Sequence, residues 1–375
     1  MKENSDNLQN SKKKNYSFKT KRADIKATFY SFINLIRNIH LASVTKKDLE
    51  KHYSDESGNM LLTNEENERF SKVDYELYLT IKGRRYNGIM SPYSDEKNQE
   101  LKKELDRKLY EHIYTVSQIC PYINFDRIYK KAKNVVYRVR EIHGDHEENI
   151  KGASFVDYPI INLHLDKDSK NVYHKEVIMT HEFTHFLCKK PKEKRTYYNH
   201  ISSFRNEGIT QYLTIMSLLK RNKDNNYINY ARGIYPLNLK YTDILVDFLG
   251  DNVIFTSYIN RDNLYINEAI KNESDIHSAG EFNIDKKFLA TLSYEEDNFH
   301  AYLYQKKKVN NKLTMNDFPY MCKLLMFISS VYDLNPDYIV AEEKKEKIKR
   351  FFEDAEYTLE SLYKMNIDQT NRKHG

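Results

Sequence analysis

The sequence predicts an α+β fold in which a core of strands and helices is flanked by mostly helical regions. Apolar residues recur at helical spacing in the first third of the chain, β-branched and aromatic residues alternate with polar ones near residues 134–165, and helical spacing returns in the last third. We therefore expect four parts: a disordered basic tail (1–22), a helical region (23–130), the α+β core (131–250) and a second, mostly helical region (251–375).

Helical patterns dominate the region before the core. Apolar residues have helical spacing at 25–39, and a polar stretch at 54–72 predicts a loop. The clearest pattern lies at 101–120, where apolar residues step by three or four along one face. This region is therefore expected to be mostly helical.

The core combines strand and helix patterns. Residues 134–143 (NVVYRVREIH) and 153–165 (ASFVDYPIINLHL) have the alternation that is typical of half-buried strands. A polar break is expected at 221–233. Helices are expected in three segments of the core: 177–187, 206–221 and 241–250. After the core, helical spacing is clearest at 321–334 and 342–365.

Composition narrows the class of protein. A hydrophobic fraction of 40% supports a packed core, and no run of about 18 apolar residues predicts a membrane span. The N-terminus has no apolar leader segment, so we expect a cytoplasmic protein, with export by a non-classical route left open. The three widely spaced cysteines, Cys120, Cys188 and Cys322, argue against a disulfide framework.

Charge is concentrated at the N-terminus. The formal net charge is +6, and residues 1–22 contribute seven basic and two acidic side chains, so the rest of the chain is close to neutral. We interpret the tail as a solvated arm, and we expect no stable nucleic-acid partner because the remaining sequence lacks basic-aromatic patterning.

Residues 181–185, His-Glu-Phe-Thr-His, match the H-E-x-x-H pattern of metal sites. On a helix, positions i and i+4 lie on one face, so the imidazoles of His181 and His185 can bind one metal ion, and tetrahedral zinc suits them. Glu182 is rotated by about 100° from His181, which suits a general base that activates water. The alternative, a buried helix without function, would leave Glu182 as a costly buried charge.

A catalytic zinc takes three protein ligands, so one more is needed. His200 and Glu207 are the two nearby candidates. We favour Glu207, because a helix that runs back beside the first can present a glutamate to the metal. Ser202 and Ser203 are suitable N-caps for that helix, and Gly208 would allow the two helices to approach closely.

The motif HEFTH followed by NEGITQYLT resembles the gluzincin zinc metallopeptidases, over roughly residues 150–220. The resemblance implies a zincin-like core, with His181, His185 and Glu207 as Zn²⁺ ligands and Glu182 as the catalytic base. Thermolysin-like members have an aspartate four residues after the ligand glutamate, whereas this chain has Gln211 there. Gln211 or Thr210 would then hydrogen-bond a ligand histidine.

The same resemblance implies two further features. One is a donor to the oxyanion of the transition state, commonly Tyr or His, for which the candidates are Tyr212 and His277, with Tyr230, Tyr258 and Tyr265 also possible by type. The other is an edge strand that pairs with the substrate backbone. Residues 154–158 or 161–165 would serve, unless they form an internal strand.

The sequence thus predicts a zinc-dependent peptidase that acts on a peptide or protein substrate. Two alternatives stay open. The chain can be a toxin or injected effector protease that acts on a host protein, or a catalytically silent, metallopeptidase-like binding or regulatory protein. Glu182 argues against the silent form, since a binding module has no use for a general base. No motif distinguishes an aminopeptidase from an endopeptidase.

Overall fold

The computed structural model describes residues 96–133, 135–142, 152–155, 160–166, 172–188, 200–277, 282–305, 316–335 and 339–373. The predicted tail and the predicted helix at 25–39 lie outside these residues. The chain divides into two compact units, and each is described by itself.

In the residues that the structure describes, the first unit contains two helices and two paired strands. The helices are α3 (Glu96–Ile119) and α4 (Asp126–Ala132), and the predicted helix at 101–120 is confirmed. Strand β1 (Val136–Ile142) pairs in parallel with β3 (Ile160–Asp166), and β2 (Gly152–Phe155) lies on the other side of β3. Because β3 is the central strand, residues 161–165 form an internal strand rather than an edge for substrate.

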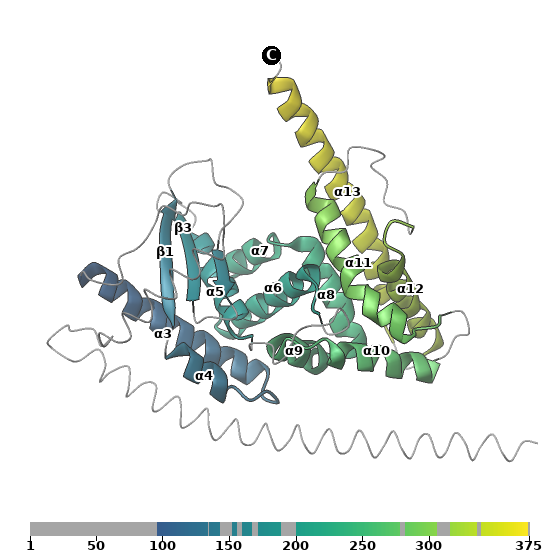
Figure 1. Cartoon of the computed structure of the whole chain (residues 1–375), viewed down its shortest axis with the longest axis horizontal. Helices are drawn as coiled ribbons and strands as arrows, with labels where there is room; N and C mark the ends of the chain where they lie inside the picture. The colour runs from purple at the N-terminus through teal and green to yellow at the C-terminus, as the bar shows by residue number, and fades with distance from the viewer. Residues whose placement is uncertain are drawn as a thin grey trace, which may run out of the picture. The chain divides into compact units, whose positions relative to one another are not determined.

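The second unit contains the H-E-x-x-H motif, and its helices are shown in Figure 1. The first four are α5 (Val172–Phe186), α6 (Ser203–Lys220), α7 (Asn225–Arg232) and α8 (Pro236–Leu249). The helices that follow in the described residues are α9 (Asp251–Asn260), α10 (Leu264–His277), α11 (Lys286–Gln305), α12 (Pro319–Leu334) and α13 (Ala341–Lys373). The predicted helices at 321–334 and 342–365 are thus confirmed.

The prediction of an α+β fold with a zincin-like strand core is wrong. Most of the described residues are helical, and α5 packs mainly against α6 and α7. Val177 of α5 belongs to a core cluster with Ile215 and Leu218 of α6 and Ile228 and Ala231 of α7. The alternating segments form only short strands, and β1 and β3 belong to the unit that does not contain α5. Helices therefore bury the apolar side of the motif helix.

The predicted polar break at 221–233 is also wrong, because it contains α7. Asp224 caps this helix by accepting hydrogen bonds from the backbone N–H groups of Asn226 (2.8 Å) and Tyr227 (3.4 Å). Ile228 and Ala231, three residues apart, are buried against α5 and α6. An N-cap aspartate before an i, i+3 apolar pair was the available signal, and the high asparagine content obscured it.

Helix α6 is the central element of the second unit, since it packs against α5, α7, α8, α9 and α11 (Figure 1). Its predicted N-cap is confirmed: the Ser202 hydroxyl accepts a hydrogen bond from the Arg205 N–H at 3.1 Å. Gly208 does not face α5 as expected. A Cβ there would lie 2.3 Å from the Thr242 hydroxyl and 2.4 Å from the Asn238 carbonyl oxygen, both on α8. The glycine therefore permits the close crossing of α6 and α8.

Two simpler predictions concern the chain's chemistry and its relation to a membrane. All three cysteines are buried and none forms a disulfide, as the expected lack of a disulfide framework requires. Among the helices of the described ranges, none combines the length and the apolar character that a bilayer crossing needs.

The α6–α8 crossing gives a prediction about stability. Gly208→Ala should lower the free energy of unfolding by about 1–3 kcal/mol or more, because the new methyl group meets backbone atoms of α8. Chemical denaturation monitored by circular dichroism measures this change. The matched control is Gly233→Ala, where the nearest atom lies 3.4 Å away and φ is −75°, and its effect should stay within about 0.5 kcal/mol. Equal effects of the two substitutions would contradict the close crossing.

Candidate metal centre

Helices α5 and α6 run antiparallel, and polar contacts join them along their length. Near the start of α6, Glu207 contacts His185. At the other end, Arg221 follows α6 and donates hydrogen bonds to Glu176 and Thr180 of α5, both at 2.9 Å. These contacts lie at opposite ends of the helix pair.

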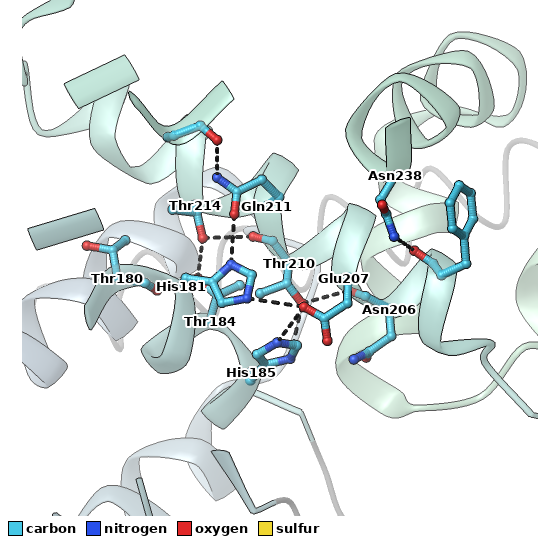
Figure 2. Close-up of polar contacts among 12 residues, drawn as sticks. Thr180, His181, Thr184, His185, Asn206, Glu207, Thr210, Gln211, Thr214 and Asn238 are labelled. Atoms are coloured by element: carbon cyan, nitrogen blue, oxygen red, sulfur yellow. Dashed lines mark hydrogen bonds and ion pairs between the residues drawn. The ribbon is translucent and has the colours of Figure 1, made fainter. Parts of the chain in front are cut away.

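Three possible metal ligands converge at the motif end of this helix pair (Figure 2). The Oε2 atom of Glu207 lies 3.2 Å from Nε2 of His181 and 3.3 Å from Nε2 of His185. One ligand atom from each of the three side chains lies within 4.8 Å of the other two. The structure thus brings together the three residues that the sequence suggested as ligands.

The spacing of these atoms is suitable for a small tetrahedral cation. Ligand atoms bound to zinc at about 2.0–2.1 Å in a tetrahedron lie about 3.3 Å from one another. The two distances from Glu207 to the imidazoles, 3.2 and 3.3 Å, agree with that edge length. The donor set of two imidazoles and one carboxylate is one that zinc uses in catalytic sites. The donor types and two of the three edges therefore fit a zinc ion, and the imidazole atoms lie within 4.8 Å of each other.

Gln211 determines which nitrogen of His181 carries a proton. The Gln211 side-chain amide donates a hydrogen bond to the Ala231 carbonyl at 2.6 Å, so its Oε1 atom must face His181. That oxygen lies 2.8 Å from His181 Nδ1, which must then be the donor. The Nε2 atom of a neutral His181 therefore presents its lone pair to the centre of the cluster. This is the second-sphere role expected for Gln211.

Thr210 has the same effect on His185. Its hydroxyl donates to the Asn206 carbonyl at 2.7 Å, so its oxygen acts as an acceptor for other partners. Two groups approach that oxygen: His185 Nδ1 at 3.2 Å and the buried Tyr258 hydroxyl at 2.7 Å. His185 thus donates through Nδ1 and directs Nε2 to Glu207. Both residues predicted to support the ligand histidines contact them.

The same hydrogen bonds restrict how the cluster can be protonated without a cation. With both Nδ1 atoms protonated, each Nε2 can donate to Glu207 only if its ring is an imidazolium ion. Two imidazolium rings whose centroids are 4.8 Å apart would repel each other in a largely buried site. Burial opposes a charge on His181, but Glu207 raises its pKa above the usual value. Burial also opposes a charge on Glu207, but the two histidines lower its pKa below the usual range.

Glu182 is buried, with 5% of its surface exposed. Its Oε2 atom has no hydrogen-bond partner among the described residues. Burial raises the pKa of Glu182, while the nearby His181 and His185 lower it in part. A buried carboxylate oxygen without a partner is costly in a core, and it is suitable for holding a water molecule or substrate group.

Other candidates from the sequence lie elsewhere. His200 pairs with Asp297 of α11 at 3.2 Å, so it is engaged away from the cluster. Tyr212 packs against Phe255 of α9, and His277 pairs with Glu273 at 3.5 Å. Neither of the two proposed oxyanion donors contacts the three ligands. Tyr258 is fully buried behind Thr210, and the hydroxyl of Tyr230 lies 2.5 Å from His174 Nδ1.

The structure adds two aromatic residues that the sequence did not suggest. The ring of Tyr235 stacks on that of His181, with centroids 5.6 Å apart, and its backbone is left-handed at φ 52°. His300 of α11 lies within electrostatic reach of Glu207, whose charge raises the His300 pKa while burial, the larger effect, lowers it. A Tyr-Pro pair at a helix start was the only available signal for Tyr235, and none marked His300.

Comparison with known proteins adds no identification. No protein-family model, curated protein or solved structure matches this chain. A functional assignment must therefore depend on the chemistry of the site.

Gln211→Leu should weaken metal binding by about tenfold to a hundredfold, because His181 loses the acceptor that orients it. Isothermal titration calorimetry with Zn²⁺ measures the dissociation constant. Gln211→Glu retains an acceptor for His181 Nδ1 and should bind zinc much more tightly than Gln211→Leu. Equal affinities of the two variants would show that the acceptor does not matter.

Glu182→Gln should stabilise the metal-free protein at neutral pH. A raised pKa in the folded state means that the wild type loses stability as pH increases through that pKa, whereas glutamine does not titrate. The difference in melting temperature should therefore grow from acidic to neutral pH, by about 2–4 °C per kcal/mol. The matched control is Glu268→Gln on the exposed surface of α10. A wild type that is more stable than Glu182→Gln at neutral pH would contradict the burial argument.

Proposed function

We propose that this chain is a zinc-dependent peptidase that hydrolyses peptide bonds in a peptide or protein substrate. One observation carries the proposal: both imidazoles of the motif direct Nε2 to the same oxygen of Glu207, while their Nδ1 atoms are committed as donors. Three lone pairs directed at one point suit a divalent cation. They add no stability to a helix that is merely buried in a core.

His181, His185 and Glu207 would hold the cation. Zinc supplies Lewis-acid chemistry, since it polarises a carbonyl oxygen and acidifies water. The two imidazoles and the carboxylate bring one negative charge to the ion, so the bound zinc retains a net positive charge. The ligands on α5 and α6 are fixed by their partners Gln211 and Thr210 before substrate arrives.

Glu182 is the proposed general base. Its unpaired Oε2 atom accepts a proton from the attacking water, whose oxygen forms a bond to the carbonyl carbon. The same oxygen of Glu182 then returns the proton to the amine nitrogen as the C–N bond breaks. The products are one carboxylic acid and one amine, and the net reaction consumes one water molecule. The raised pKa of Glu182 brings it closer to that of an efficient proton carrier.

The test combines metal analysis with cleavage of a broad peptide library. The wild type should bind about one zinc ion per chain and cleave peptides, whereas Glu182→Gln should bind zinc equally and lose about 10²-fold or more in cleavage rate. Glu207→Ala should lose zinc, while His200→Ala should retain it, because His200 pairs with Asp297 instead.

Three outcomes would contradict parts of this proposal. A wild type without stoichiometric zinc would refute the metal centre. Zinc without cleavage of any peptide would favour a catalytically silent binding protein. Loss of zinc from His200→Ala, with retention in Glu207→Ala, would show that the third ligand was chosen wrongly.

A further inference from the structure

A buried charged network surrounds the start of α6, two residues before Glu207. Arg205 is fully buried, and its guanidinium donates to Glu296 Oε1 of α11 at 2.5 Å and to Asn263 before α10. The hydroxyls of Tyr241 and Ser202 also donate to the Glu296 carboxylate, each at 2.5 Å. All five side chains have 0% exposure. Three other segments of the unit are thus joined to the first turn of α6.

Further contacts secure the same turn. Asp297 of α11 accepts a hydrogen bond from the Ser203 N–H at 2.5 Å. Asn238 of α8 donates to the Phe204 carbonyl at 3.0 Å. The N–H groups in the first turn of a helix lack intrahelical acceptors, and such ends commonly fray. Here Asp297 of α11 accepts from one of these N–H groups, and Asn238 adds a contact from α8 to the same turn, so the end of α6 that carries Glu207 is secured.

Arg205 and Glu207 project to opposite sides of α6. Two residues along a helix correspond to a rotation of about 200°. Glu207 faces the histidines of α5, and Arg205 faces α11. The network therefore contacts the side of the first turn of α6 that lies opposite the Glu207 carboxylate. It contacts none of the three ligands.

Stability alone does not explain this arrangement. Removing a large cation and a carboxylate from water is costly, and hydrophobic residues of similar size often stabilise a fold at least as well. The Arg205 Nε atom, moreover, is buried with no hydrogen-bond partner among the described residues. What an ion pair adds is a defined orientation, because the planar guanidinium donates good hydrogen bonds only to partners at a narrow range of positions.

We propose that the Arg205–Glu296 network is a positioning device for the metal centre, which sets the axial position and rotation of α6 so that the Glu207 carboxylate meets both imidazoles. Arg205, Tyr241 and Glu296 are positioning residues that act through Glu207. This inference rests on the proposed function only in its assumption that the three ligands bind a divalent metal; it does not depend on peptide cleavage.

The test replaces the network by apolar side chains of similar size. A single Arg205→Met substitution would leave Glu296 as an isolated buried charge and risks unfolding the protein. The triple variant Arg205→Met, Tyr241→Phe, Glu296→Leu removes the charges together and should remain folded. Circular dichroism and thermal unfolding establish its fold, calorimetry measures the Zn²⁺ dissociation constant, and the visible absorption of the Co²⁺-substituted protein reports the coordination of the metal.

The matched control is the ion pair at the far end of α6. Arg221→Met with Glu176→Leu removes the contact that joins the C-terminal end of α6 to α5, but it lies more than three helical turns from Glu207. Both variants lose an inter-helix ion pair. Only the first is expected to disturb the ligand carboxylate.

The folded triple variant should bind Zn²⁺ about tenfold to a hundredfold more weakly than the wild type, with an altered Co²⁺ spectrum. The control should match the wild type in both measurements, even if its melting temperature falls. A folded triple variant with wild-type affinity and spectrum would overturn the positioning role, and so would equal weakening in the control. If the wild type itself binds neither metal, the proposed function fails at its first step, which is a distinct result.

Discussion

Two imidazole rings and one carboxylate oxygen meet at the motif end of α5 and α6, and the rest of the unit is arranged around that meeting. The Nδ1 atom of each ring has an acceptor behind it, which holds the ring with its Nε2 atom toward Glu207. Gln211 and Thr210 supply the acceptors, and the Ala231 and Asn206 carbonyls orient these two side chains. The site thus extends into the end of α7 and along α6 through hydrogen bonds that leave little freedom.

Burial of polar side chains on α6 costs free energy, and contacts with neighbouring groups offset that cost. Thr210, Gln211, Thr214 and Ser217 are all fully buried on this helix. The Thr210 and Thr214 hydroxyls donate to the carbonyls of Asn206 and Thr210, and the Thr214 hydroxyl also lies 3.3 Å from that of Thr184. A helix with such an interior depends on close neighbours, and the crossing at Gly208 and the network at its start provide them. Stability and site geometry therefore depend on the same packing.

The sequence predicted the local features well. The H-E-x-x-H spacing, the N-cap at Ser202 and the periodic helices are properties of short segments, and short-range rules determine them. The predictions from the sequence failed where the result depended on which helices and strands pack against one another. Residues 136–142 and 160–166 form strands, as their alternation predicts, but these strands belong to the unit that does not contain α5, and helices form the core cluster around Val177. The helix that Gly208 contacts and the position of Tyr212 were not predicted correctly for the same reason. The apolar pattern of one helix does not identify the helix that packs against it.

By itself, the sequence determined the residue types and spacings that allow metal chemistry: two histidines one turn apart, an acid between them and a second acid at the start of a following helix. Only the tertiary structure decided that Glu207, rather than His200, reaches the histidines, and that Asp297 of α11 engages His200 instead. It also placed Arg205 against Glu296 across 91 positions of the chain. Contacts over such separations depend on how whole helices pack, and no local pattern of residues encodes that arrangement.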